Sequence, residues 1–232
     1  MNGFRTRVDV PELLDTGEGS PEDVRASLRD LERISRYLGG TFAVTRYLYP
    51  RLRQHRTAVI ADIGTGSAEL PAQIARWSTR HGITARMLAI DFSARNLDIA
   101  RGNAQTQPTI KLIQADANHL PFARSQVDYV ISSLFLHHLP PEDVVALLRH
   151  SYERARRGII MSDLERSWMT LASFKLVQPL FARSYITRND AAASVRRGYT
   201  SAELRDLARD AGLTNARVHR PFPFRMTLTA DK

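Results

Sequence analysis

Three carboxylates follow three apolar runs along this chain, and a glycine turn comes directly after the first of them. The first run, residues 59–61, leads through Asp62 and Ile63 into Gly64-Thr65-Gly66. Small residues let the backbone fold tightly, so that a ligand can lie close to the main chain where the next helix begins. Asp91 and Asp116 stand at the ends of the second and third runs. The pattern predicts a cofactor-binding crossover.

The residues of the turn discriminate between possible ligands. A dinucleotide fingerprint needs a third glycine where this chain has Glu69, a long side chain at a point where helix and strand pack closely, so NAD is disfavoured. No lysine follows the turn, which excludes the phosphate loop of nucleotide triphosphatases. The remaining pattern, D-x-G-x-G-x-A, resembles the first motif of class I S-adenosylmethionine-dependent methyltransferases, in which the turn wraps around the methionine part of the cofactor.

Later motifs extend this resemblance over roughly residues 40 to 229. Asp91, followed by Phe92, stands where a carboxylate accepts hydrogen bonds from the ribose hydroxyls. Asp116-Ala117 matches the family's adenine-binding position, and 127–140 resembles the fourth motif of small-molecule methyltransferases. The resemblance implies S-adenosyl-L-methionine as cofactor, bound by Asp62, Ile63, Gly64, Thr65, Gly66, Asp91, Phe92, Asp116, Ala117 and Ser133.

A purely structural interpretation exists for each carboxylate. Asp62 could cap the turn and Asp91 the following helix, because acidic residues near a helix start stabilise it by about 0.3 to 1 kcal/mol. The common position of the three carboxylates, at the carboxyl ends of successive strands, favours a ligand site instead.

Alternating strand and helix patterns predict an α/β, Rossmann-like fold with a seven-stranded, mostly parallel sheet and helices on both faces. We expect helices over 20–38, from about 42, and over 70–81, 94–102, 141–156 and 201–211, a fifth strand over 158–163, and antiparallel sixth and seventh strands over 215–220 and 224–229. The expected division is an N-terminal helical segment, 1–55, packed on a catalytic domain, 56–232, with a helical insertion at about 165–199.

The first half of that insertion, 168–181, has apolar residues on more than one side of a helix. Such a helix must be buried or lie against an apolar ligand or partner. We expect a lid over the active site that sets substrate choice. A homodimer interface is the alternative, and both roles are possible at once.

The mechanism implied by the cofactor needs few groups. A sulfonium methyl is already electrophilic, so the protein must align a nucleophile, exclude water and, for a phenol, remove a proton, which contributes about 10²- to 10⁴-fold. His137 and His138, just beyond the fourth strand, are the candidate bases, and Asp163, at the end of the fifth, is the next candidate base or substrate anchor. A histidine there could also merely cap or pack beneath the cofactor.

Adjacent residues do not share a helical face, so we expect at most one of the two histidines to face the methyl group. The spacing suggests no third ligand for a metal ion, and we expect no metal.

Charge and composition narrow the partners. The net charge of +9 invites a nucleic-acid interpretation, but the arginines are spread singly over predicted helices, with no dense basic tract and interleaved aromatics, which disfavours nucleic acid. The absence of cysteine excludes thiolate chemistry. No apolar run is long enough to span a membrane or to form a signal peptide, so we expect a cytoplasmic protein.

We expect methyl transfer to a small, largely apolar or aromatic substrate. The leading hypothesis is O-methylation of a phenolic or quinol-type hydroxyl in bacterial secondary metabolism, since 29–40 and 197–200 resemble methyltransferases of polyketide and phenolic lipid pathways, a kind of natural product biosynthesis. The alternatives are C-methylation of a quinone precursor and an RNA or protein methyltransferase.

Overall fold

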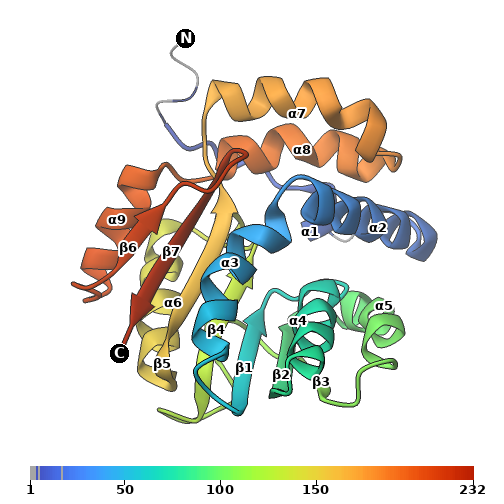
Figure 1. The fold of residues 1–232 in the computed structure, drawn as a ribbon. Helices are drawn as coiled ribbons and strands as arrows, with labels where there is room; N and C mark the ends of the chain where they lie inside the picture. Colours follow the sequence, from blue (N-terminus) through green and yellow to red (C-terminus); the bar gives the residue numbers. More distant parts are fainter. Residues whose placement is uncertain (1–3, 5, 17) are drawn as a thin grey trace.

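A seven-stranded sheet forms the centre of the computed structural model, which describes residues 4, 6–16 and 18–232. Its strand order is β3-β2-β1-β4-β5-β7-β6 (Figure 1). The strands are β1 (Thr57–Ile63), β2 (Thr84–Asp91), β3 (Ile110–Gln114), β4 (Val127–Ser133), β5 (Ala155–Leu164), β6 (Arg217–His219) and β7 (Arg225–Asp231). The first five are parallel, as predicted.

The two last strands differ in direction. β7 is antiparallel to β5, and β6 is antiparallel to β7. The prediction of antiparallel sixth and seventh strands is confirmed, and the two reversals return β6 to the direction of β1–β5. The antiparallel pairing places the first residue of β7 beside the last residues of β5.

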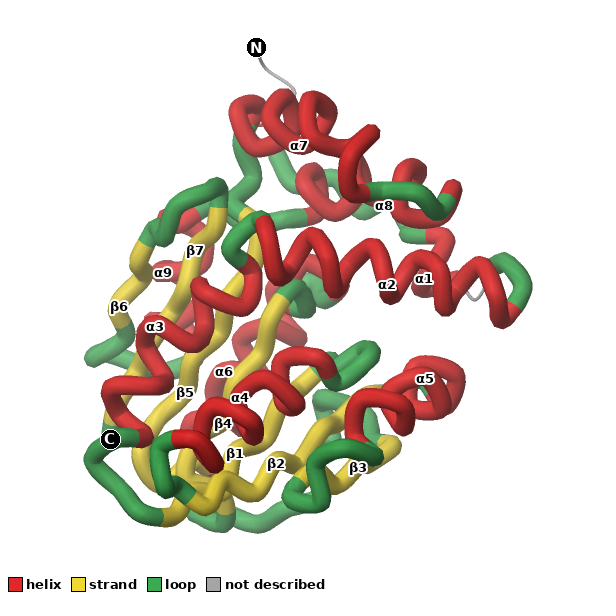
Figure 2. The backbone as a smooth tube through the Cα atoms, turned by 45° about the vertical axis from the view of Figure 1, so that its right-hand side comes forward, coloured by secondary structure: helices red, strands yellow, loops and turns green. Residues whose placement is uncertain are grey.

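Helices cover both faces of the sheet (Figure 2). On one face, α3 (Gly40–Leu52) and α4 (Glu69–Arg80) share a core with β1, β2 and β4, and α5 (Ala94–Ala104) packs beside them. On the other, α6 (Pro141–Arg154) and α9 (Ser201–Asp210) form the larger core with β4, β5 and β7. Burial on both faces agrees with the continuous apolar runs of β4 and β5. The predicted fold class is confirmed.

Four helices stand apart from these layers, above the carboxyl ends of the strands (Figure 1). They are α1 (Leu13–Thr16), α2 (Pro21–Tyr37), α7 (Trp168–Phe181) and α8 (Tyr185–Arg197). Ser20 caps the start of α2: its side chain accepts a hydrogen bond from the Asp23 N–H in a reciprocal capping box. α1 and α2 pack against α8, and α7 closes the group. Residues distant in sequence thus roof one edge of the sheet, while the predicted division at residue 55 stays a prediction.

The insertion helix α7 is less buried than its composition suggested. Its inner side chains Phe174 and Val177 line a cavity, but Leu176 and Leu180 on its outer side are 81% and 73% exposed. The expectation that α7 is covered on all sides is therefore met only on its inner face. Within the described residues, no helix combines the length and apolarity needed to cross a membrane.

Candidate active site

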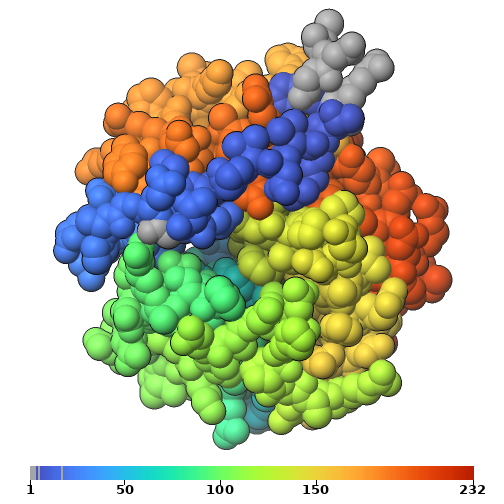
Figure 3. Space-filling model, turned by 180° about the vertical axis from the view of Figure 1, so that it is seen from behind, coloured from blue at the N-terminus to red at the C-terminus, as the bar shows by residue number. Residues whose placement is uncertain are grey.

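A cleft of about 550 Å³ lies at the carboxyl ends of β1 and β2. Seen from behind, it is the hollow between the N-terminal segment and the part of the chain around residues 90–117 (Figure 3). Six of the residues expected to bind cofactor line it, namely Ile63, Gly64, Gly66, Asp91, Phe92 and Ala117. The structure therefore brings three successive strand ends together in one cavity, as the sequence predicted.

The turn after β1 needs glycine at Gly64. This residue has φ +69°, and a Cβ there would overlap the ring of Phe135. Beneath the turn, Asp62 accepts a hydrogen bond of 2.7 Å from the Thr65 hydroxyl, and burial raises the pKa of Asp62 to about 7. Asp62 and Thr65 therefore shape the turn and do not line the cleft.

The carboxylate of Asp91 is held in the cleft wall by the same turn. It accepts hydrogen bonds from the main-chain N–H groups of Gly66 at 2.8 Å and Ser93 at 2.9 Å. Burial raises the pKa of Asp91, and these two N–H groups oppose the rise. A fixed carboxylate at this point is suited to accept hydrogen bonds from ribose hydroxyl groups, and that role stays a prediction.

Like Asp62 and Thr65, two further predicted cofactor residues, Asp116 and Ser133, lie outside the residues that line the cleft. Asp116 accepts a hydrogen bond from the Asn118 N–H and its side chain is 47% exposed, whereas Ala115 and Ala117 line the cleft. Ser133 is also absent from the lining, and its buried hydroxyl has no hydrogen-bond partner among the described residues. The strand end was located correctly, but side-chain directions there were not predictable.

Sequence reasoning missed other parts of the wall. Leu28 and Leu31 of α2 and Phe135 after β4 line the cleft. The available signal was the amphipathic pattern of α2, which is also compatible with ordinary core packing.

A second, largely apolar cavity of about 670 Å³ adjoins the cleft under α7. Leu14, Leu31, Leu134 and His138 line both spaces, so the two meet there. Tyr37, Phe42 and Phe222 line the second cavity and are 53% or more exposed, which places them toward its mouth. Ligands in the two spaces would approach each other at His138.

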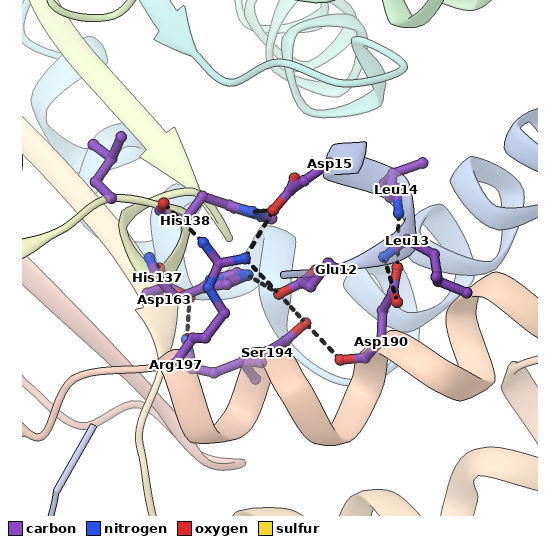
Figure 4. A network of polar contacts seen from close by, with 12 residues as sticks. Glu12, Leu13, Leu14, Asp15, His137, His138, Asp163, Asp190, Ser194 and Arg197 are labelled. Atoms are coloured by element: carbon purple, nitrogen blue, oxygen red, sulfur yellow. Dashed lines mark hydrogen bonds and ion pairs between the residues drawn. The ribbon is translucent and has the colours of Figure 1, made fainter. Parts of the chain in front are cut away.

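His137 stands in the wall of the second cavity and is tied to Asp163 (Figure 4). Its Nδ1 lies 2.7 Å from one carboxylate oxygen of Asp163, and its main-chain N–H donates to the other at 2.9 Å. Burial acts to raise the pKa of Asp163, but the adjacent imidazole holds it below its usual value. With Nδ1 engaged, Nε2 is the nitrogen available to accept a proton.

His138 lies against its neighbour. Both histidines belong to the 3₁₀ turn Leu136–His138, their ring centroids are 4.1 Å apart, and both line the second cavity. Both rings therefore border the same cavity, while the expectation that at most one of them faces the methyl group stays a prediction. The Nδ1 of His138 lies 2.8 Å from Asp15, which also receives a hydrogen bond from Arg197 at 2.8 Å.

Glu12, which sequence reasoning missed, completes this cluster from the N-terminal segment (Figure 4). Its carboxylate oxygen lies 3.6 Å from His137 Nε2 and accepts a hydrogen bond of 2.9 Å from the Ser194 hydroxyl. Burial raises the pKa of Glu12 to about 7. Nothing in the sequence spacing pointed to this contact, because Glu12 and His137 are joined only by tertiary packing.

Glu12, His137 and His138 place three possible ligand atoms within 4.8 Å of one another. Glu12 is thus a third candidate metal ligand that the sequence spacing did not suggest. The side chain of Arg197, 3.8 Å from Glu12, already supplies a positive charge to the cluster. The expectation that no metal is bound stays a prediction.

Comparisons with known proteins agree with this arrangement. Residues 60–158 match the family model described as a methyltransferase domain. The chain is similar to demethylmenaquinone methyltransferase of Staphylococcus saprophyticus, at 25% identity over 68% of this chain and 70% of that protein. It is also similar to the demethylmenaquinone methyltransferase of Staphylococcus aureus, at 26% identity over 59% of this chain and 61% of that protein.

Solved structures share the fold. Human N-acetylserotonin methyltransferase in complex with S-adenosylmethionine has a TM-score of 0.66 at 14% identity, covering 95% of this chain and 61% of that one. Magnesium protoporphyrin IX methyltransferase of Synechocystis, with bound S-adenosylhomocysteine, has a TM-score of 0.57 at 18% identity, covering 99% and 90%.

Proposed function

Since the chain belongs to the class I S-adenosylmethionine-dependent methyltransferases, we propose that it methylates a hydroxyl group on a small, apolar aromatic acceptor. The observation that carries this proposal is the apolar cavity of about 670 Å³, which meets the cofactor cleft at His138 and has His137 in its wall. A cavity of this size and lining suits a drug-sized apolar ligand.

The cleft fits the family's cofactor. Its main chain passes without a side chain at Gly64 and Gly66, and Asp91 stands in its wall. Together with Ile63, Phe92 and Ala117, these residues would hold S-adenosylmethionine, which supplies an electrophilic methyl group when bound. The chain itself then has to orient the acceptor, exclude water and manage one proton.

His137 is proposed as the base that receives the acceptor's hydroxyl proton at Nε2. Asp163, bonded to Nδ1, keeps the imidazole in the tautomer that can accept and stabilises the charge that develops. Asp163 is a positioning residue here, because it is buried behind His137 and does not line the cavity. His138, which lies where the two spaces meet, packs against that ring, is held by Asp15 and so positions the base.

C-methylation is the second candidate. Its support is the similarity to two demethylmenaquinone methyltransferases. Removal of a hydroquinone proton by the same base would raise the electron density on the ring carbon, so the same site serves either outcome. Isotope-labelled methyl and product NMR distinguish an O-methyl from a C-methyl group.

The apolar lining of the cavity under α7 supports a small acceptor over a polymer. A wide, open, basic mouth would suit RNA or a protein side chain better. Assignment to bacterial natural product biosynthesis is part of the proposal and rests on the apolar acceptor that this cavity would take.

A homodimer formed through the outer face of α7 is a further part of the proposal. Trp168, Met169, Leu176 and Leu180 are each at least 50% exposed along this one helix. We expect the Leu176→Ser, Leu180→Ser double variant to shift the mass in light scattering from dimer to monomer. A wild-type chain that is monomeric at high concentration contradicts the dimer.

The function is tested with purified protein, S-adenosylmethionine and a panel of alkylphenols, hydroxybenzoates and hydroquinones, with products detected by mass spectrometry. Methylation of members of this panel is expected. Failure on the whole panel, combined with methylation of RNA, would contradict the proposal.

A further inference from the structure

A buried arginine lines the acceptor cavity, and its side chain has no hydrogen-bond or ion-pair partner among the described residues. Arg225 is the first residue of β7, is 3% exposed and lines the cavity. Its Nη1 atom is buried without a hydrogen bond, and its guanidinium takes part in no hydrogen bond or ion pair within residues 4, 6–16 and 18–232.

The carboxylate of Asp163, the opposite charge near Arg225, already makes its hydrogen bonds to other groups. Arg225 begins β7 opposite the end of β5, where Leu164 is its register partner and Asp163 is the preceding residue. Asp163 accepts hydrogen bonds from the main-chain N–H groups of His137 and Leu164 and engages His137 Nδ1. The guanidinium is therefore attracted by Asp163 without being hydrogen-bonded to it.

Burying an unpaired charge is costly, by several kcal/mol per ion in real proteins. Burial lowers the pKa of Arg225 to about 10, opposed by Asp163, so the group is still charged at neutral pH. A guanidinium group in the wall of an apolar cavity has the geometry to bind a planar oxyanion such as a carboxylate through two parallel hydrogen bonds.

We propose that Arg225 binds an anionic oxygen of the acceptor, so that the substrate is a hydroxylated aromatic compound bearing a carboxylate or an ionised second hydroxyl. The description of this ligand as a methyl acceptor rests on the proposed function. Binding of the oxyanion to Arg225 can be measured without turnover. Because Arg225 and His137 line the same cavity, an acceptor whose oxyanion is held by Arg225 can place its hydroxyl toward His137. Arg225 is thus a specificity-determining residue for the acceptor.

Calorimetry in the presence of S-adenosylhomocysteine tests this. The probes are a hydroxybenzoate, its methyl ester, the phenol without the carboxyl group, and a nitrophenol that is ionised at neutral pH. We expect the wild type to bind the hydroxybenzoate on the order of 10- to 100-fold more tightly than the ester, as for hydrogen bonds to charged groups. A similar preference for the nitrophenolate over the neutral phenol identifies an ionised hydroxyl as a second acceptable oxyanion, and its absence restricts the site to carboxylates.

The Arg225→Met variant should lose this preference while keeping its affinity for S-adenosylhomocysteine, and Arg225→Lys should retain part of it. Arg220→Met is the matched control, since Arg220 precedes the same strand, is exposed and pairs with Glu165. This control should behave as the wild type.

The proposal is overturned if the wild type binds ester and acid equally, or if Arg225→Met keeps the preference. A purely structural role would lower the melting temperature of Arg225→Met and Arg225→Lys without changing the ratio of acid to ester affinity. Oxyanion binding through Arg225 without methylation of any aromatic compound would refute the proposed function and leave the binding site intact.

Discussion

The pairing of Asp163 with His137 gives the sharpest prediction. In the Asp163→Asn variant, the side chain keeps its shape but loses its charge and one acceptor oxygen. The wild-type carboxylate engages Nδ1 of His137 at 2.7 Å, the His137 N–H at 2.9 Å and the Leu164 N–H at 2.6 Å. An amide NH₂ group placed toward Nδ1 would favour the opposite imidazole tautomer, in which Nε2 carries the proton and cannot accept another.

The expected effect is the loss of general-base catalysis. That contribution is about 10²- to 10⁴-fold in kcat, or about 3 to 5 kcal/mol of transition-state stabilisation. The His137→Gln variant removes the same function, so the double variant should be little worse than either single one. Affinity for S-adenosylhomocysteine should be unchanged in all three, because neither residue lines the cofactor cleft.

The assay is kcat at saturating cofactor and acceptor, with calorimetry and thermal melting to verify cofactor binding and folding. Asp128→Asn is the matched control. Asp128 is also a buried aspartate on the sheet, but it accepts a hydrogen bond from Val59 N–H near the amino end of β4, far from the cleft. The Asp128→Asn variant should be less stable than the wild type and keep the wild-type kcat. The reasoning is refuted if folded Asp163→Asn and His137→Gln both keep kcat within about threefold of the wild type.

Other predictions follow from the site. Gly64→Ala should lower affinity for S-adenosylhomocysteine by more than about tenfold, because the Cβ overlaps Phe135, whereas Gly82→Ala, at the same φ of +69° but in open space, should keep wild-type affinity in calorimetry. Burial raises the pKa of Glu12 to about 7, so the folded state retains a proton that the unfolded chain releases above its ordinary 4.5. The free energy of unfolding should therefore fall by up to about 3 kcal/mol as pH rises through this window, and Glu12→Gln should flatten the profile in urea denaturation; an unchanged profile contradicts the assignment. Treatment with a chelator should leave kcat unchanged, and recovery of lost activity on adding a divalent cation would show that Glu12 and the histidines hold a metal.

Local patterns predicted the fold, and six of the residues expected to bind cofactor line one cleft, whose role stays a prediction. The turn at 62–66 and the alternating strands depend on residues close in sequence, through the φ angle of Gly64 and the apolar runs of β1 and β4. Side-chain direction was harder, as Asp116 shows, because the strand-end loop turns this carboxylate out of the wall. The sequence also did not show that the rings of His137 and His138 lie 4.1 Å apart in the wall of one cavity, because that contact depends on the packing around their turn.

The sequence by itself determined the cofactor class and the edge of the sheet that carries the proposed site, because glycine conformations and strand ends are local properties. Only the tertiary structure decided which groups meet there. His137 follows β4, Asp163 ends β5 and Arg225 begins the antiparallel β7, so these residues converge because the three strands are neighbours in the order β4-β5-β7. Glu12 joins them through the packing of α1 on α8, a contact between segments more than 100 residues apart that no local pattern records.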